Sequence, residues 1–345
     1  MNKRIQAIDI LRGATVALMI LVNNPGSWEA VWGPLKHAAW NGLTLADLVF
    51  PLFLFVMGVS MYFSLRKGGF KLSWKILKRA LMLIFIGLVL NWMGSAFWTH
   101  SFGLSSLRYT GVLQRFGLCF GLSALLVCLL PHKSLPWVGV AFLAAYTGIL
   151  LAGNGYAYGP ENILSRFDRA LIPDAHLYLD NGIDPEGILS TLPCLSHTLA
   201  GFLIGKLVAE KKERATLLSG IALLAAGLLI SIWLPINKKI WSPRFVLVLC
   251  GLGTVLLVAI YYITDEKRIL KGTRFFRDFG TNAIYCYVIA HFIAWALSGT
   301  GFHEWFMGLF AAPSAWSSLA YSVLCVLLTW LSVIPLRRKG IYLKL

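Results

Sequence analysis

The sequence predicts an all-α fold, a polytopic bundle of about ten membrane-spanning helices with both termini in the cytoplasm. Of the 345 residues, 58% are hydrophobic and only 13% are charged, roughly half of the charged fraction that is usual in soluble domains. The apolar residues gather in ten stretches of about 20 residues, the length that a helix needs to cross a bilayer. Most of the 31 Lys and Arg residues lie between these stretches. They are concentrated in every second connection, and these connections share one side of the predicted membrane.

Each predicted span is an apolar run bounded by polar residues, and helices are expected because a bilayer core offers no water to backbone groups. The first run follows a basic N-terminus and resembles a signal peptide. Asp9 and Arg12 interrupt it, so we interpret it as a retained first helix. One transmembrane domain is expected over residues 1–345. The ten spans are residues 7–25, 44–65, 74–94, 110–130, 135–152, 187–208, 214–234, 244–264, 280–298 and 314–335.

The distribution of basic residues predicts the orientation. Lys and Arg are concentrated before the first span, after every second span and in the C-terminal tail, whereas the loops on the other side hold few of them. The positive-inside rule therefore places both termini in the cytoplasm. A net charge of +16 would suggest a nucleic-acid partner in a soluble protein, but here we attribute it to topology and expect no nucleic acid. The expected location is the bacterial inner (cytoplasmic) membrane, with the lipid bilayer as surroundings.

Most loops on the predicted outer side are long, and long ordered loops are more often functional than short connections. The long loops include residues 26–43, 91–109 and 153–186, and the last concentrates acidic residues. That acidic loop could attract a cationic substrate or could be an ordinary solvated surface. The six cysteines all fall within apolar runs without C-x-x-C spacing, which predicts buried thiols and neither a disulfide framework nor a metal site.

Ionisable residues within the predicted spans are candidates for function, because a charge at membrane depth is costly. Asp9 and Arg12 are three residues apart on the first helix and can pair with each other, either for structure or for function. Arg115 follows Gln114 near the start of the fourth span and has no acid nearby in the sequence. Its guanidinium needs either an acid from another helix or an anionic ligand such as a phosphate.

The densest polar cluster lies around the first outer loop. Asn23 and Asn24 end the first span, and His37 precedes the second. His37 is a natural acid or base because its ordinary pKa lies near neutrality, and Asp47 could orient its ring. Alternatively Asp47 is only a helix cap, because residues 44–47 read T-L-A-D, an S/T-x-x-D pattern.

The most specific run in the sequence is K-H-A-A-W-N-G-L-T-L-A-D-L-V-F-P at residues 36–51. Further motifs lie along the whole chain, at residues 8–13, 22–23, 55–58, 111–115, 184–193, 279–283 and 341–345. In these residues the chain resembles the heparan-α-glucosaminide N-acetyltransferase family, whose bacterial members include the NagX-type proteins. The family's lysosomal members are expected to have an extra lumenal domain and a helix ahead of this core. The first outer loop is expected to be longer here between Asn23 and His37.

The resemblance implies a transmembrane N-acetyltransferase that moves the acetyl group of cytosolic acetyl-CoA to an amine of glucosamine, or of a glucosamine-ended saccharide, on the periplasmic side. His37 matches the family's active-site histidine, and Asn23 and Asp47 match its polar neighbours. Attack of an amine on a thioester needs a base and donors for the developing oxyanion. We assign the base to His37, its orientation to Asp47 and the oxyanion contact to Asn23.

The remaining site assignments concern the two substrates. Asn41 and Trp40 are expected to contact the acceptor, with Asn41 a weaker helper in catalysis. Arg115, Gln114 and Arg12 are expected to bind CoA, and the basic inner flanks would steer its phosphates. No metal is expected. Direct transfer is preferred to an acetylated His37, because a neutral amine is already a good nucleophile.

Two other functions compete with this interpretation. A related membrane O-acyltransferase would modify a hydroxyl of an envelope polysaccharide. A sugar transporter should have paired broken helices in corresponding halves of the chain, and the sequence has no such symmetry. The expected partners are glucosamine or a short amino-sugar saccharide, and a second copy of the chain in a homodimer.

Overall fold

The computed structural model describes residues 4–230 and 234–343. Lys3 of the first basic flank, the end of the predicted span 214–234 and the last two residues of the 341–345 motif lie outside these ranges. The described residues form helices joined by loops, and the bridge between Asp180 and Ile183 is their only trace of β pairing. The predicted all-α fold is therefore confirmed.

Nine helices in the described part of the chain are long and apolar enough to cross a membrane. Helices α10 (Arg274–Thr281) and α11 (Ala283–Gly299) qualify together although the pair is bent by 92°, and counting the pair as one broken span gives ten. The prediction of about ten spans is thus confirmed, while the location of the termini stays a prediction. The other nine are α1 (Gln6–Asn23), α2 (Leu45–Lys67), α3 (Trp74–Thr99), α4 (Val112–Leu129), α5 (Leu135–Ala152), α7 (Thr191–Ala209), α8 (Glu213–Ile230), α9 (Pro243–Tyr261, extended by a π-helical turn, Tyr262–Glu266) and α13 (Ala315–Arg338).

The helix boundaries differ from the sequence expectation at several points, and the following differences concern the outer loops. Helix α3 continues to Thr99 instead of ending near residue 94. It ends at Thr99 because the next residue, His100, adopts a left-handed conformation with φ of 53°. Two short helices, α6 (Ile163–Leu171) and α12 (Phe302–Gly308), occupy stretches that we expected to be loops. Asn162 precedes helix α6, and its side chain accepts a hydrogen bond from Leu164 N at 2.9 Å, the usual geometry of an N-cap.

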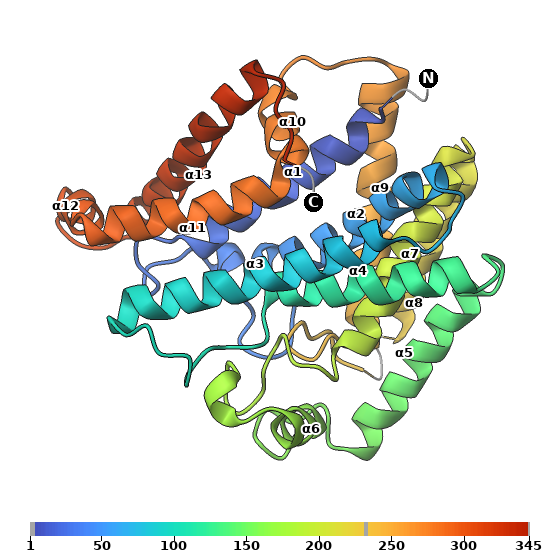
Figure 1. The fold of residues 1–345 in the computed structure, drawn as a ribbon, viewed down its shortest axis with the longest axis horizontal. Helices are drawn as coiled ribbons and strands as arrows, with labels where there is room; N and C mark the ends of the chain where they lie inside the picture. The colour runs from blue at the N-terminus through green and yellow to red at the C-terminus, as the bar shows by residue number, and fades with distance from the viewer. Residues whose placement is uncertain (1–3, 231–233, 344–345) are drawn as a thin grey trace. The chain divides into compact units, whose positions relative to one another are not determined.

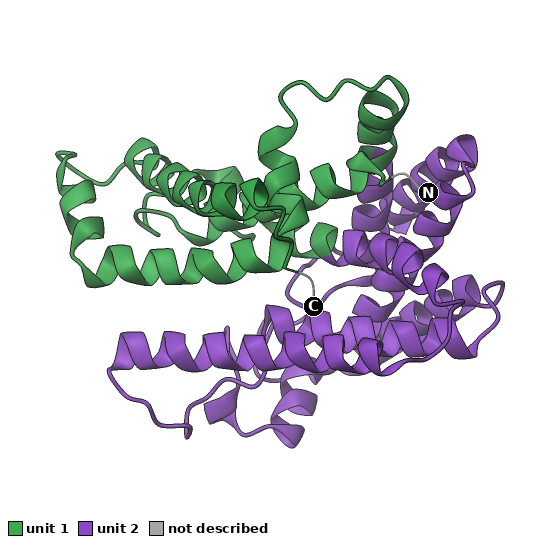
Figure 2. Ribbon diagram, turned by 45° about the horizontal axis from the view of Figure 1, so that its top comes forward, with its two compact units in different colours: residues 1–38, 43–53, 256–344 green, residues 39–42, 54–255, 345 purple. Residues whose placement is uncertain are grey.

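The chain separates into two compact units, coloured in Figure 2. Unit 1 contains residues 4–38, 43–53 and 256–343, and unit 2 contains residues 39–42, 54–230 and 234–255. Helices α2 and α9 each run from one unit into the other. The prediction of a single domain over residues 1–345 stays a prediction.

In unit 1, helix α1 packs on α10 with their backbones in direct contact. A Cβ added to Gly13 would lie 1.7 Å from the Phe276 carbonyl oxygen, and one added to Gly280 would lie 1.8 Å from the Asp9 carbonyl oxygen. Glycine at both positions is therefore required by the close approach, as at other small-residue contacts between membrane helices. The Asp265 carboxylate caps α1 by accepting from Gln6 N at 2.8 Å and Ala7 N at 2.9 Å.

In unit 2, helices α3 and α4 lie side by side (Figure 1), and α7 packs against both α4 and α5. Helix α7 also meets the later part of α2 through glycine, since a Cβ on Gly201 would lie 2.3 Å from the Phe55 carbonyl oxygen. A separate apolar cluster under the long loop after α5 joins Tyr146, Leu164 and Ile240. That cluster supports the segment that carries Trp40.

Candidate active site

His37 and Asp47 meet in unit 1, where the first outer loop joins α2. The His37 Nδ1 atom lies 2.8 Å from Asp47 Oδ1. The Asp47 side chain is only 1% exposed, whereas that of His37 is 41% exposed. An ionised carboxylate can only accept hydrogen bonds, so an ionised Asp47 would favour the tautomer with the imidazole proton on Nδ1 and the lone pair on Nε2. A ring held in this way by a buried acid is arranged to act as a base.

Asp47 also caps α2, and its two carboxylate oxygens have different hydrogen-bond partners. Oδ2 accepts from the Thr44 backbone N at 3.1 Å, from Thr44 Oγ1 at 2.9 Å and from Ala38 N at 3.1 Å, whereas Oδ1 accepts from His37. The two interpretations of the T-L-A-D pattern are therefore compatible. The cap fixes the carboxylate, and the carboxylate fixes the ring. Its negative charge also lies at the favourable end of the helix dipole.

Asn23 is the last residue of α1 and is exposed in unit 1. The neighbouring Asn24 turns its side chain back onto the helix and donates from Nδ2 to Ile20 O at 2.7 Å. The Asn24 carbonyl in turn accepts from Ser322 Oγ of α13 at 3.0 Å. The end of α1 is thus fixed by Asn24, and the role of Asn23 as an oxyanion donor stays a prediction.

Trp40 and Asn41 belong to unit 2, where they tie residues 39–42 to two loops. Trp40 donates from Nε1 to Tyr156 O at 3.0 Å and stacks on Tyr158, with ring centroids 4.6 Å apart. Asn41 Oδ1 accepts from Asn237 Nδ2 at 3.2 Å. An aromatic pair with one polar edge already satisfied offers an apolar surface that suits the face of a sugar ring. Binding of the acceptor by these residues stays a prediction.

Arg115 is buried in unit 2, only 1% exposed, and its hydrogen bonds go to the segment before α7. Nη1 donates to Pro185 O at 3.0 Å, and Nη2 donates to Gly187 O at 2.6 Å and Ser190 Oγ at 2.5 Å. Sequence reasoning expected an acid or an anion as the partner, and the structure supplies carbonyl and hydroxyl oxygens. These contacts fix the turn at residues 185–190. The assignment of Arg115 to a CoA phosphate stays a prediction.

The other two residues assigned to CoA are also placed. Gln114 packs beside Gly87 and Gly111 in unit 2, and its Nε2 is buried without a hydrogen-bond partner among the described residues. Arg12, in unit 1, donates from Nη1 to Asp9 Oδ1 at 3.2 Å and to Gly280 O at 3.0 Å. The predicted Asp9–Arg12 pair is therefore confirmed, and Arg4 joins it on the other Asp9 oxygen.

Most acidic residues of the outer loop after α5 form ion pairs with basic residues of the same unit. Arg108 Nη2 donates to Asp184 Oδ1 at 3.0 Å and to Glu186 Oε2 at 2.7 Å. Burial opposes ionisation of Glu186, but the charges of Arg108 and Arg115 outweigh it and lower the Glu186 pKa. Asp174 and Asp180 pair in the same way with basic residues. Sequence reasoning missed Arg108, whose separation of more than 70 residues from its partners gives no local signal.

Asp168 differs from the other acids of this loop because it is buried without a cation in hydrogen-bond contact. Its Oδ1 accepts from Leu189 N at 3.1 Å, while Oδ2 has no hydrogen-bond partner among the described residues. Burial raises the pKa of Asp168 to about 6. This carboxyl group therefore titrates close to neutral pH.

The six cysteines are free thiols, five buried and Cys128 half-buried, as the sequence predicted. Two histidines inside spans have packing environments. His197 lies between the rings of Phe55 and Trp241, and His291 bonds the Tyr287 carbonyl through Nδ1 at 2.8 Å.

Comparison with known proteins identifies similar sequences over most of the chain. Residues 4–232 match the family model described as heparan-alpha-glucosaminide N-acetyltransferase, catalytic. The human protein named heparan-alpha-glucosaminide N-acetyltransferase is 31% identical over 83% of this chain and 52% of its own length. The mouse protein of the same name is 30% identical over 83% of this chain and 53% of its own length. The chain thus spans about half the length of these relatives.

Proposed function

The chain belongs to the heparan-alpha-glucosaminide N-acetyltransferase family, and from this premise we propose that it is a transmembrane N-acetyltransferase acting on glucosamine or a glucosamine-ended saccharide. The donor is acetyl-CoA from the cytosol, and the acceptor binds on the periplasmic side of the inner membrane. The observation that carries the proposal is the contact between an exposed His37 and a buried Asp47. It supports a base on the loop that the Lys and Arg distribution predicts to be outside.

The proposed reaction is direct acyl transfer. The acceptor amine attacks the thioester carbonyl carbon while Nε2 of His37 removes a proton from the nitrogen, and Asp47 stabilises the imidazolium that forms. The amide of Asn23 donates to the developing oxyanion. The C–S bond then breaks, CoA leaves as a thiolate, and the proton on His37 neutralises it. The products are one N-acetyl sugar and one free CoA thiol.

The acceptor and donor sites are proposed from the remaining polar residues. Trp40 and its stacked partner Tyr158 would lie against a sugar face, with Asn41 beside them. Gln114 supports a contact to CoA, because its buried Nε2 lacks a partner among the described residues. Arg12, near the predicted cytoplasmic end of α1, would contribute positive charge near the CoA phosphates, and Arg115, near the predicted outer end of α4, would complete the polar site. A homodimer is part of the same proposal and is checked by the mass of the purified chain in detergent.

A reconstituted assay tests the activity. The purified full chain is mixed with acetyl-CoA and either glucosamine or glucose, free CoA is followed with a thiol reagent, and the sugar product is weighed by mass spectrometry. We expect CoA release that depends on glucosamine and a product heavier by one acetyl group. Release with glucose alone would favour an O-acyltransferase. Uptake of sugar into vesicles without CoA release would favour a transporter.

A further inference from the structure

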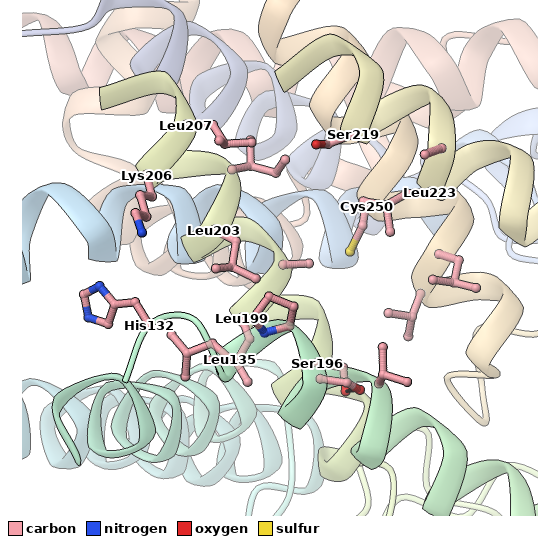
Figure 3. Close-up of a pocket in the computed structure, with 18 of the residues that line it drawn as sticks. His132, Leu135, Ser196, Leu199, Leu203, Lys206, Leu207, Ser219, Leu223 and Cys250 are labelled. Atoms are coloured by element: carbon pink, nitrogen blue, oxygen red, sulfur yellow. Dashed lines mark hydrogen bonds between the residues drawn. The ribbon is translucent and has the colours of Figure 1, made fainter. Parts of the chain in front are cut away.

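A cavity of about 680 Å³ lies wholly within unit 2, between α5, α7, α8 and α9 (Figure 3). Aliphatic side chains such as Leu199, Leu203 and Leu223 line most of its wall. A volume of this size is in the range of clefts that hold whole ligands and far exceeds the space of one water. None of its lining residues belongs to the candidate active site, so the cavity needs an explanation of its own.

The charged residues that line the cavity all come from one end of the helices. His132 and Lys133 precede α5, Lys206 and Glu210 lie at the end of α7, and Lys212 precedes α8. In Figure 3, His132 and Lys206 lie on the same side, away from Ser196 and Cys250. The cavity therefore has a charged mouth and an apolar interior, the same division that an amphipathic ligand has.

The mouth has a positive potential. Glu210 is neutralised by Lys212, whose Nζ lies 2.8 Å from Glu210 Oε2, and no described ion pair uses Lys133 or Lys206. Burial lowers the pKa of His132, and the nearby charge of Lys206 lowers it further. Helices α5 and α8 begin here while α7 ends here, so their dipoles partly offset one another and the positive charge comes from the lysines.

The apolar part extends over most of the depth of one membrane leaflet. From Leu135 to Leu143, helix α5 rises roughly 12 Å, compared with about 15 Å for half of a hydrocarbon core of about 30 Å. A polar ligand such as CoA would leave its amides and adenine without partners against this wall. Of the two serines that line it, Ser196 already donates to Gly139 O at 2.9 Å. An acyl chain needs no such partners.

We propose that this cavity binds an acyl chain of an anionic glycerophospholipid whose phosphate is held at the mouth by Lys133 and Lys206. In the predicted orientation the mouth faces the cytoplasmic leaflet, where anionic lipids create a negative surface potential. The bound lipid fills the space between α5, α7 and α8 and stabilises their packing. This site is independent of acetyl transfer, and its failure would leave the proposed activity untouched.

The test uses the delipidated full chain in a non-ionic detergent. Dioleoyl phosphatidylglycerol, dioleoyl phosphatidylcholine or glycerol 3-phosphate is added, bound lipid is counted by native mass spectrometry, and the thermal midpoint is recorded. We expect one phosphatidylglycerol per chain with a raised midpoint, about tenfold weaker binding of phosphatidylcholine, and no effect of glycerol 3-phosphate.

Two variants separate the head-group contact from the acyl contact. A Cβ on Gly139 meets nothing within 4 Å, so Gly139→Leu should project into the cavity and abolish binding of both lipids. Gly148→Leu is its matched control, because Gly148 is on the same helix, equally open, and does not line the cavity. The double variant Lys133→Gln/Lys206→Gln should lose only the preference for phosphatidylglycerol. Lys71→Gln/Lys75→Gln is its control and should keep that preference.

Several results would overturn the proposal. Equal binding of the two lipids by the wild-type chain would remove the anionic head group from it. Full phosphatidylglycerol binding by a folded Gly139→Leu variant would place the lipid elsewhere, and stabilisation by glycerol 3-phosphate alone would indicate a phosphate site. Displacement of the lipid by CoA would assign the cavity to the acyl donor. If Gly139→Leu does not fold, the lysine variant decides alone, since Lys133 is exposed and its loss should not impair folding.

Discussion

At the scale of single residues, the contact between His37 and Asp47 joins a helix cap to a candidate base. The carboxylate is buried and accepts four hydrogen bonds, three of which hold the start of α2 and the preceding loop. The imidazole that it positions is partly exposed. Stability and catalysis therefore depend on different atoms of the same carboxyl group, and variants can separate them.

The first prediction concerns His37→Gln. Loss of the base should lower kcat for acetyl transfer about 10²- to 10⁴-fold, while the thermal midpoint should stay near wild type because the ring is exposed. Glucosamine-dependent CoA release and a melting curve measure the two effects. His100→Asn is the control, since His100 is exposed at a left-handed position that Asn tolerates. Wild-type turnover by His37→Gln would remove the proposed mechanism.

A second pair of variants separates the two uses of Asp47. Asp47→Asn should lower kcat on the order of 10³-fold or more, because a neutral amide stabilises an imidazolium poorly. Thr44→Val removes the cap hydroxyl and should lower stability by about 1 kcal/mol while leaving the rate near wild type. Steady-state rates and thermal midpoints of both variants distinguish these outcomes. If Asp47→Asn changed only the midpoint, Asp47 would be a helix cap alone.

The third prediction follows from Asp168. Its pKa is raised to about 6 in the folded chain, so the folded state binds more protons than the unfolded state between about pH 4 and pH 6. Stability should therefore fall as the pH rises through this window. Asp168→Asn should be more stable than wild type at pH 7.5, by about 3 kcal/mol, with the difference vanishing near pH 4.

Thermal midpoints across pH 4 to 8 measure this effect. Asp174→Asn is the matched control, because Asp174 is an exposed acid of the same loop that is paired with Arg169, and its loss should change little. A less stable Asp168→Asn variant at pH 7.5 would show that the ionised carboxylate contributes favourably, through the charge of Arg115.

At the scale of elements, glycines decide how closely the helices approach. Bilayer lipids provide no hydrophobic driving force between helices, so close backbone contact supplies much of the attraction. Gly13 and Gly280 do this between α1 and α10, and Gly58 and Gly201 do it between α2 and α7. Hydropathy located these helices but contains no information on which glycine faces which neighbour.

The fourth prediction concerns Gly280→Ala. Its Cβ would lie 1.8 Å from the Asp9 carbonyl oxygen, a backbone atom, so α1 and α10 must separate. We expect a loss of about 1–3 kcal/mol of stability, the usual cost of overpacking. Gly148→Ala on α5 has open space around its Cβ and should be neutral or slightly stabilising. A melting curve of each purified variant measures the difference, and equal midpoints would contradict the contact.

At the scale of the whole molecule, orientation decides which side of the membrane holds His37. The expectation depends on the Lys and Arg between the spans, and the proposed periplasmic acceptor depends on it in turn. The arrangement of the helices is the same in either orientation, so helix packing does not show which side of the membrane holds His37. A labelling experiment can determine that side.

The fifth prediction uses single cysteines in a Cys128→Ser background, where the other native thiols are buried. Gly33→Cys lies in the first outer loop, and Lys71→Cys lies between α2 and α3; both positions are exposed. A membrane-impermeant maleimide should label Gly33→Cys in cells with a permeabilised outer membrane, and Lys71→Cys only after lysis. The reverse pattern would place His37 in the cytoplasm and contradict the proposed topology.

The sequence alone determined the ten spans, the family and the Asp9–Arg12 pair, because each depends on residues that are close together in the chain. Runs of apolar residues, an i to i+3 spacing and the 36–51 motif are all local signals. It also identified His37 and Asp47 as candidates, but left open whether Asp47 caps a helix or orients a base.

The tertiary structure decided what depends on contacts between distant residues. In the folded chain one oxygen of Asp47 contacts the helix cap and the other contacts the imidazole. Arg115 donates to carbonyl groups some 70 residues away, and acids of the outer loop pair with Arg and Lys. The tertiary structure also introduced the 92° bend between α10 and α11 at Asn282 and formed the cavity between α5, α7, α8 and α9. Hydrogen bonds and cavities depend on distances in space between residues that are far apart in the chain. Hydropathy and sequence spacing carry no information on these distances.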